Sequence, residues 1–391
     1  MNSTRRHIVI GVTLLCASTA PVLAPAAEPL KVGLILPMSG PFASTGRQAD
    51  AAVKLFIQQN GSTVAGRQIE IILKDDGGIS PDVTKRLAQE LVARDKVQVL
   101  AGFGLTPLAL AAAPVATQAK VPMIVTNAAT SIIPQRSPYI VRTSMTLPQV
   151  TAPMAHWAAK NGIKSVITLV SDYGPGIDSE KVFVKEFTAA GGKVTAALRV
   201  PLRNPDYSPF LARVKDAKPD ALFVFVPSGE GAAVMKQFAD RGLAGAGIRL
   251  IGTGDILDDD LLPSIGDAAL GVVSSHHYSA AHTSAENRAF VAAFTKANPG
   301  MRPNYQAVGA YDGMHLLYAA LKKTGGNSEG TKLLDAMKGQ SWTSVRGPVT
   351  IDPQTRDVVQ NVYIRRAEKR DGSVYNLEFE TVEKFRDPGV Q

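Results

Sequence analysis

The chain has 391 residues, of which 42 are Lys or Arg and 34 are Asp or Glu, so its formal net charge is +8. Apolar residues make up 45% of the sequence, enough to fill a sizeable core, which excludes a wholly disordered chain. A single cysteine can form neither an internal disulfide nor a cysteine-based zinc site. The length is typical of two or three domains.

The N-terminus has the pattern of a secretory signal peptide. Arg5 and Arg6 precede the apolar run Ile8–Leu15, and Ala24-Pro25-Ala26 supplies the small residues of a cleavage site. This run is too short to span a bilayer, which takes about 20 apolar residues. We therefore predict that residues 1–26 are removed and that the mature protein, starting at Ala27, is exported and soluble. Losing Arg5 and Arg6 lowers the net charge from +8 to +6 and also removes the only cysteine.

From Leu30 onward, short apolar runs alternate with amphipathic stretches. The runs predict strands at Lys31–Leu36, Ile69–Leu73, Val97–Ala101 and Pro122–Val125. The stretches predict helices at Gln48–Gln59, Ser80–Arg94 and Thr106–Gln118. Ser80-Pro81 and Thr106-Pro107 each place a capping hydroxyl before a proline. This alternation indicates βαβ units and a parallel sheet.

The same pattern then restarts as a second α/β set. Its predicted strands are Ser165–Val170, Val194–Val200, Ala221–Val226 and Arg249–Gly252. Its predicted helices are Gln149–Asn161, Ser179–Ala190, Ser208–Ala217 and Gly231–Arg241. Later elements are Gly271–Tyr278, helices near Ser284–Asn298 and Tyr305–Lys323, and a hairpin of Asn361–Ala367 with Val374–Glu380. Two such lobes leave a cleft at the carboxyl ends of their strands, where open α/β sheets bind ligands.

Polar turns follow two strands of the first set. Gly102-Phe103-Gly104 precedes a helix, but Pro107 occupies the third glycine position of a dinucleotide fingerprint, so that motif fails. The N–H groups at this helix start, with the Thr106 hydroxyl, suit a carboxylate, although Thr106 fits equally well as a helix cap. Asn127-Ala128-Ala129-Thr130 is the analogous turn one unit later, and it also fits an ordinary loop. Together the two turns favour a small anionic or polar ligand.

Three side chains occupy corresponding strand ends in the second set. Tyr173 can cover an apolar or aromatic ligand body while its hydroxyl binds a polar end. Ser228 and Asp255 follow two further strands. Each position alone is more typical of a loop than of a site, but their shared placement raises the joint expectation of a ligand site.

Other chemistries lack their motifs. There is no G-x-S-x-G, C-x-x-C or H-E-x-x-H motif. His276, His277 and His282 do not predict a metal site, because alternate residues of a strand would face opposite sides. Asp258-Asp259-Asp260 is typical of a helix start. The basic run Arg365–Arg370, interrupted by Glu368, is typical of a solvated surface rather than a nucleic-acid patch. We expect a non-enzymatic protein with no cofactor, no metal and no nucleic-acid partner.

The segment Lys31–Phe42, KVGLILPMSGPF, resembles the first strand and loop of type I periplasmic substrate-binding proteins. The most similar branch binds leucine, isoleucine and valine for ABC importers. Further matches are Gly46, Gly66-Arg67, Asp75-Asp76, Pro122-Met123-Ile124, Tyr173-Gly174 and Asp312-Gly313.

This resemblance implies an α/β fold of two Rossmann-like lobes with parallel sheets, joined by three hinge crossovers. The N-terminal lobe would comprise residues 27–145 and 275–346, and the C-terminal lobe residues 146–274 and 347–391. The crossovers would lie near Arg142–Pro148, Gly271–Tyr278 and Arg346–Ile351.

The resemblance also implies roles for site residues. Thr106 would bind a ligand carboxylate, Ala128 and Thr130 would contribute backbone contacts, and Tyr173 would be the cleft tyrosine. The acidic residue that neutralises an amino-acid ammonium aligns near Gly254, one place from Asp255. A loop aromatic of the family aligns near Thr45, although Phe42 is close. The ligand is then a branched-chain amino acid or, if Asp255 does not reach it, an aromatic acid; members that bind aromatic acids resemble the chain in Asn127–Thr130.

We therefore expect a monomeric periplasmic protein that captures a small carboxylate ligand for an ABC importer. Open and closed forms would exchange, and a ligand held between the lobes would stabilise the closed form that the importer's membrane subunits recognise. A periplasmic sensor subunit that presents its ligand to a membrane receptor is the alternative.

Overall fold

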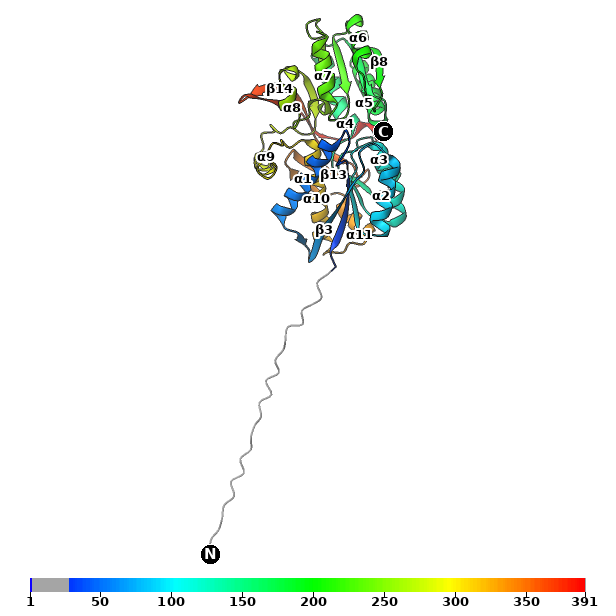
Figure 1. The fold of residues 1–391 in the computed structure, drawn as a ribbon, viewed down its shortest axis with the longest axis vertical. Helices are drawn as coiled ribbons and strands as arrows, with labels where there is room; N and C mark the ends of the chain where they lie inside the picture. Colours follow the sequence, from blue (N-terminus) through cyan, green and yellow to red (C-terminus); the bar gives the residue numbers. More distant parts are fainter. Residues whose placement is uncertain (2–27, 391) are drawn as a thin grey trace.

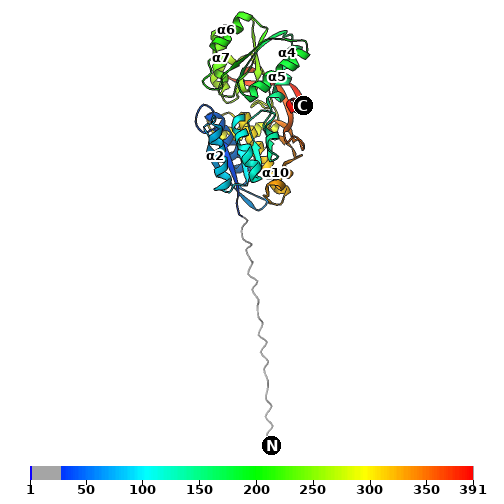
Figure 2. The ribbon, with the colours of Figure 1, turned by 90° about the vertical axis from the view of Figure 1, so that its right-hand side faces the viewer.

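The computed structural model describes Met1 and residues 28–390, and it shows two lobes placed one above the other (Figures 1 and 2). The predicted signal peptide, with its cleavage site, lies outside the described residues. None of the helices within residues 28–390 combines the length and the apolar composition needed to cross a membrane.

The first lobe is built on a six-stranded sheet with the order β2-β3-β1-β4-β5-β6. Its strands are β1 (Leu30–Leu36), β2 (Thr63–Val64), β3 (Arg67–Asp75), β4 (Val99–Gly102), β5 (Met123–Val125) and β6 (Ile140–Arg142). Its helices are α1 (Ala43–Asn60), α2 (Pro81–Ala93) and α3 (Thr106–Ala119), joined by the later α9 (Ala285–Ala297), α10 (Tyr305–Lys323) and α11 (Gly330–Met337). Figure 1 shows α2 and α3 on one side of the sheet and α1 and α10 on the other.

The second lobe is built on a nine-stranded sheet with the order β12-β13-β14-β11-β10-β9-β7-β8, in which β15 pairs with β14. Its first strands are β7 (Ser165–Ser171), β8 (Lys193–Val200), β9 (Ala221–Phe225), β10 (Arg249–Thr253) and β11 (Val273–His276). Its last strands are β12 (Ser341–Ser344), β13 (Gly347–Ile351), β14 (Val358–Arg370) and β15 (Ser373–Phe385). Its helices are α4 (Leu147–Lys160), α5 (Gly174–Ala189), α6 (Ser208–Ala217), α7 (Gly231–Asp240) and α8 (Leu262–Ile265).

The apolar runs of the sequence become strands that are buried on both faces. In β9 all five residues are buried, because helices cover both sides of a parallel sheet. The neighbouring pairs β1–β3, β1–β4, β7–β9 and β9–β10 are all parallel. The prediction of parallel α/β sheets is therefore confirmed. The antiparallel strands β12 to β15 come from the C-terminal segment, where a hairpin was predicted.

Two predicted helix caps are wrong. Thr106 is the first residue of α3 itself, Leu105 holds the cap position, and no side chain caps this helix. Ser80 does precede α2, but its side chain makes no capping hydrogen bond. The Thr106 hydroxyl instead lies 2.9 Å from the Thr130 hydroxyl of the neighbouring turn.

Short and long-range elements escaped the sequence patterns. The strand β6 has only three residues, too few to show a period, and α5 begins at Gly174 rather than at Ser179.

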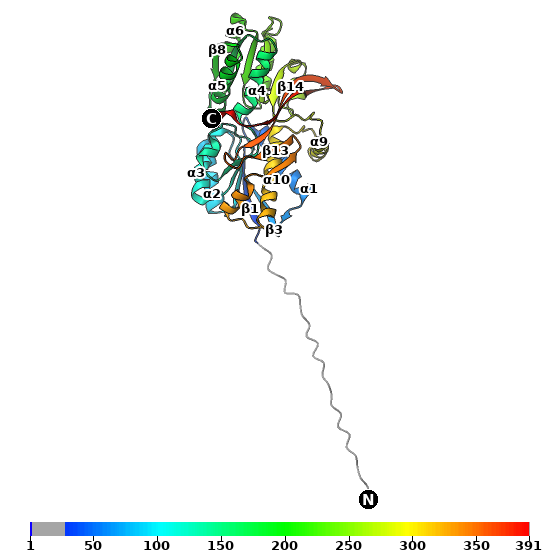
Figure 3. The same ribbon diagram turned by 180° about the vertical axis from the view of Figure 1, so that it is seen from behind.

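The proposed lobe boundaries stay a prediction, and the second sheet does not divide at them. The strand β12 pairs with β13, although its Trp342 and Ser344 donate hydrogen bonds to Asp312 of α10 in the first lobe. Figure 3 shows β13 at the level where the two lobes meet.

Buried arginines connect the segments that pass between the lobes. Arg142, at the end of β6, donates to Asp357 Oδ1 at 2.6 Å, and the Arg346 guanidinium lies 3.0 Å from Asp312 Oδ2. Arg365 of β14 is also buried and donates to the Tyr278 carbonyl and to Ser274. The prediction that the basic run at 365–370 is wholly solvated is therefore wrong for Arg365, whose side chain points into the lobe.

Candidate functional site

A cavity with an empty volume of about 440 Å³ lies between the two lobes. Its lining includes seven of the predicted site residues: Phe42, Thr106, Asn127, Ala128, Tyr173, Ser228 and Asp255. Thr130 is the remaining one, and it contacts Thr106 through its hydroxyl rather than lining the cavity. Residues from distant parts of the sequence thus meet in one place, and their roles in ligand binding are taken up as proposals below.

The first-lobe end of the cavity presents hydrogen-bond donors. Thr106 is only 3% exposed, and its Oγ1 also lies 3.4 Å from the Thr130 backbone nitrogen. Ala128 lines the cavity, but its N–H donates to the Phe103 carbonyl at 3.0 Å and is therefore already used. The Ala129 N–H has no partner among residues 28–390, and Ala129 also lines the cavity. A hydroxyl, a free N–H and the start of α3 together suit an anionic oxygen.

A close backbone approach holds this end in place. Gly102, at the end of β4, has φ +109, and a Cβ there would lie 2.2 Å from the Ile35 carbonyl oxygen. Only glycine therefore allows β4 to turn directly beside β1 and deliver α3 to the cavity.

The second-lobe end carries a buried carboxylate. Asp255 is 4% exposed, and it accepts hydrogen bonds from Tyr305 Oη and Thr253 Oγ1, each at 2.8 Å. Burial opposes its ionisation, but neighbouring His276, Tyr305 and Thr253 outweigh this and hold the pKa of Asp255 below its usual value. Asp255 is therefore an anionic acceptor, and each of its oxygens has room for a further donor.

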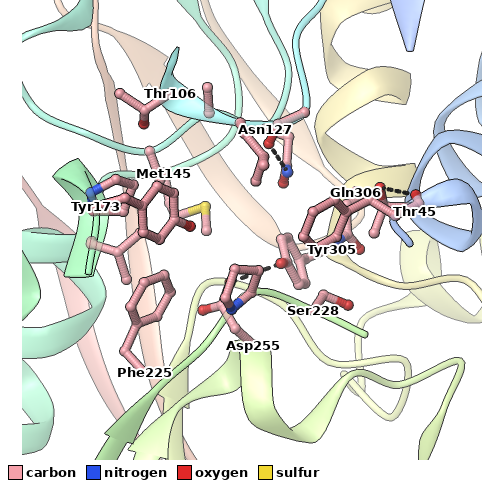
Figure 4. Close-up of a pocket in the computed structure, with 18 of the residues that line it drawn as sticks. Thr45, Thr106, Asn127, Met145, Tyr173, Phe225, Ser228, Asp255, Tyr305 and Gln306 are labelled. Atoms are coloured by element: carbon pink, nitrogen blue, oxygen red, sulfur yellow. Dashed lines mark hydrogen bonds between the residues drawn. The ribbon is translucent and has the colours of Figure 1, made fainter. Parts of the chain in front are cut away.

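Aromatic and apolar side chains separate these two ends. The Tyr173 and Phe225 rings are stacked with centroids 6.1 Å apart and an interplanar angle of 17°. Figure 4 shows Tyr173, Met145 and Phe225 along one side, with Thr106 at the upper end of the cavity and Asp255 at the lower end, beside Phe225. Burial raises the pKa of Tyr173 well above its usual value, so its hydroxyl stays protonated. The cavity therefore offers a flat apolar wall with polar groups at opposite ends.

The lobes contact each other around the cavity. The Ser131 N–H of the first lobe donates to Asp178 of α5 at 3.3 Å, and Arg203 of the second lobe donates to the Ile79 carbonyl at 3.0 Å. Asn304, which precedes α10, donates to both oxygens of Asp258 at 3.0 Å. These contacts join the two lobes around the cavity.

The acidic run does more than begin a helix, so that prediction is incomplete. Asp258 and Asp259 are both buried, and α8 begins only at Leu262. Asp258 accepts hydrogen bonds from Ser228 and from Asn304, which joins the lobes. Burial raises the pKa of both carboxyl groups to about 6.

The prediction that His276 and His277 face opposite sides of a strand is wrong. The rings of His276 and His277 lie 4.5 Å apart rather than on opposite faces, because β11 ends at His276. Burial lowers the pKa of His276 to about 4 and also lowers that of His277, so both are neutral at neutral pH. His282 lies apart from them and contacts Glu378 at 2.7 Å.

Sequence reasoning missed several residues of the lining. They include Thr45, Met145, Phe225, Tyr305 and Gln306. Tyr305 and Gln306 open α10, whose cap Asn304 accepts hydrogen bonds from two of its N–H groups. An asparagine before a helix is a detectable cap signal, but only the tertiary structure shows that this helix start faces the cavity.

Comparison with known proteins gives consistent matches. A family model described as "Periplasmic binding protein" matches residues 29–373. Leu/Ile/Val-binding protein homolog 6 of Brucella abortus is 44% identical over 98% of this chain and 99% of the relative. A solute-binding protein of an ABC transporter from Rhodopseudomonas palustris BisB5, solved with 3,4-dihydroxybenzoic acid, is 62% identical. That match has a TM-score of 0.91 and covers 93% of this chain and 99% of the other.

A second solute-binding protein from R. palustris was solved with 4-hydroxybenzoate. It is 44% identical, with a TM-score of 0.90, and the match covers 93% of this chain and 99% of the other. The predicted two-lobed fold is confirmed by these structures. Both sequence and structure place the chain in one family: it belongs to the periplasmic binding proteins.

Proposed function

We propose that this protein is the substrate-binding component of an ABC importer and that it captures a hydroxybenzoate-type aromatic acid between its lobes. The observation that carries this proposal is the separation of the polar ends of the cavity. Thr106 and Asp255 belong to different lobes, and the Tyr173–Phe225 stack lies between them. A benzene ring with a carboxylate at one end and a hydroxyl at the other has the same arrangement of groups.

Each end has a defined task in this proposal. The ligand carboxylate accepts hydrogen bonds from the Thr106 hydroxyl and the Ala129 N–H, and the start of α3 favours its charge. The ligand hydroxyl donates to Asp255, an anionic acceptor. Tyr173 and Phe225 contact the ring between the two ends.

A branched-chain amino acid fits this cavity less well. Its carboxylate and ammonium are attached to one carbon atom, so they cannot extend to polar groups that lie at opposite ends of the cavity. Its aliphatic side chain would also offer Asp255 no donor from the ligand. The relatives solved with 3,4-dihydroxybenzoic acid and 4-hydroxybenzoate support the aromatic assignment.

The cellular role follows from the family. We propose that residues 1–26 direct export, that the protein acts in the periplasm as a monomer, and that it performs no chemistry on its ligand. Ligand binding stabilises the closed arrangement, which the importer's membrane subunits recognise.

A ligand panel tests the proposal directly. We expect 4-hydroxybenzoate to raise the melting temperature far more than leucine or valine, because a ligand at 100 times its Kd stabilises the folded state by about 2.7 kcal/mol. Differential scanning fluorimetry, followed by calorimetric titration, measures this. A larger shift with leucine would overturn the aromatic assignment and make Asp255 an ammonium partner.

A single hydroxyl tests the carboxylate end. Thr106→Val keeps the side-chain shape, and we expect it to weaken 4-hydroxybenzoate binding by about 1.5–3 kcal/mol, because it removes one hydrogen bond to a charged group. Calorimetric titration gives the Kd. Thr117→Val is the matched control, since Thr117 lies on the same helix but bonds to Ala113 and Ser137. Equal affinities for Thr106→Val and the wild type would remove Thr106 from the site.

A further inference from the structure

Gln306 presents an amide that the protein itself leaves unbonded. Its side chain is 2% exposed, and within residues 28–390 neither its Nε2 nor its Oε1 has a hydrogen-bond partner. Gln48, which is equally buried in the same lobe, donates to the Arg302 carbonyl at 2.9 Å and accepts from the Asn304 N–H at 3.2 Å. A buried amide without partners is costly, so this side chain requires a partner from outside the chain.

Asn127 supplies a second unbonded atom on the same side of the cavity. Its Nδ2 donates to the Gly104 carbonyl at 2.7 Å, which fixes the amide and leaves Oδ1 as a buried acceptor without a partner. Figure 4 shows Asn127 and Gln306 on the side of the cavity away from Tyr173 and Phe225.

These two amides also line a side chamber. It is small and is otherwise lined by Leu36, Pro37, Thr45, Ala49, Gly104 and Thr126. Pro37, Thr45, Gly104, Asn127 and Gln306 line both the chamber and the main cavity, so the two spaces adjoin. A substituent on the edge of a ring in the main cavity would therefore face one fixed acceptor, Asn127 Oδ1, and one amide, that of Gln306, which can donate or accept.

We propose that Gln306 and Asn127 form a subsite that recognises a second hydroxyl group on the ligand ring, next to the hydroxyl held by Asp255. The second hydroxyl donates to Asn127 Oδ1 and accepts from Gln306 Nε2. This inference rests on the proposed function, because it takes the aromatic acid to lie with its carboxylate at Thr106. It adds the residues that select a vicinal dihydroxybenzoate over a monohydroxybenzoate.

The position of Gln306 supports this selectivity. Gln306 follows Tyr305 in α10, and the Tyr305 hydroxyl donates to Asp255 at 2.8 Å. The amide therefore belongs to the same helix turn that orients the Asp255 end of the site, where two adjacent ring hydroxyls would be read together. A site that binds such a hydroxyl discriminates strongly against the analogue that lacks it, because its buried polar groups are then left unpaired.

The test compares 3,4-dihydroxybenzoate with 4-hydroxybenzoate by calorimetric titration. The wild type should bind the dihydroxy acid at least tenfold more tightly. Gln306→Met should lose most of that preference through weaker binding of the dihydroxy acid, with less than a threefold change for the monohydroxy acid. The melting temperature of ligand-free Gln306→Met should not fall, because the substitution removes an unbonded buried amide. Gln48→Met is the matched control: it should lower the melting temperature and leave the ligand preference intact.

A measurement on the wild type alone adds an independent arm. Replacing the second hydroxyl by a methoxyl group, in 4-hydroxy-3-methoxybenzoate, removes its proton, so affinity should fall at least tenfold below that for the dihydroxy acid. If both hydroxybenzoates bind but their ratio is the same in wild type and Gln306→Met, the subsite is overturned while the proposed function stands. If neither acid binds the wild type, the proposed function itself fails.

Discussion

Replacing Arg142 by methionine is expected to lower the free energy of unfolding by about 3–5 kcal/mol, the range for breaking a buried ion pair from one side. Arg142 is fully buried, and it donates to Asp357 Oδ1 at 2.6 Å and to the carbonyls of Ala128 and Thr130 at 3.0 and 2.9 Å. Methionine keeps much of the volume but leaves Asp357 and both carbonyls without their donor. Urea unfolding of the ligand-free protein measures the effect.

Two further variants test whether the loss of stability in Arg142→Met comes from the buried, unpaired carboxylate. Lys236→Met removes an exposed i,i+4 ion pair with Asp240 and should change the stability little. The double variant Arg142→Met with Asp357→Leu should recover part of the loss, because it no longer leaves a charge buried without a partner. A loss below about 1 kcal/mol for Arg142→Met alone would show that the pair contributes little.

This arginine also matters for the ligand site. The carbonyls that it binds belong to the turn containing the Ala129 N–H, so the Arg142–Asp357 pair connects the end of β6 to the donors at the carboxylate end. The segment that passes between the lobes and the turn that carries the site's donors are therefore held by the same arginine. Arg142→Met should weaken aromatic-acid binding as well as lower stability.

The second large effect concerns the other end of the cavity. Asp255→Asn is expected to weaken 4-hydroxybenzoate binding by about 1.5–3 kcal/mol, the range for a hydrogen bond to a charged group. Affinity for benzoate, which lacks the hydroxyl, should change little. The ratio of the two dissociation constants, measured by calorimetry, therefore reports on Asp255 directly.

Asp259→Asn provides the control for this experiment. Asp259 is equally buried and lies 3.7 Å from Arg365, but it does not line the cavity. Its loss should affect stability without changing the preference for 4-hydroxybenzoate over benzoate. An unchanged preference in Asp255→Asn would mean that the ligand hydroxyl is bound elsewhere.

Much of the architecture was predictable because it depends on local pattern. The runs that became β1, β4, β7 and β9 are predominantly apolar, as strands buried on both faces must be. Polar residues that follow such strands lie at the carboxyl-end edge of their own sheet. Thr106 follows a strand of one sheet and Asp255 a strand of the other, and both line the cavity between the lobes.

Patterns failed where burial is decided by distant segments. Arg365 lies in a basic run and yet is buried, because Tyr278, Ser274 and Asp259 from other parts of the chain surround its guanidinium. Gln306 looks like any polar residue at a helix start. Its exposure to the cavity depends on how α10 packs against α1, which no local pattern contains.

The alternation of strands with helices by itself determined a two-lobed α/β chain with a cleft suited to a small anion, and the resemblance of Lys31–Phe42 to a known family indicated the periplasmic binding proteins. Only the tertiary structure decided which groups line that cleft and how they face each other. Arg142 and Asp357 are 215 positions apart, and Tyr305 and Asp255 are 50 apart. The reason is physical: periodicity reports which face of an element is buried, whereas the chemistry of a site depends on which buried faces meet.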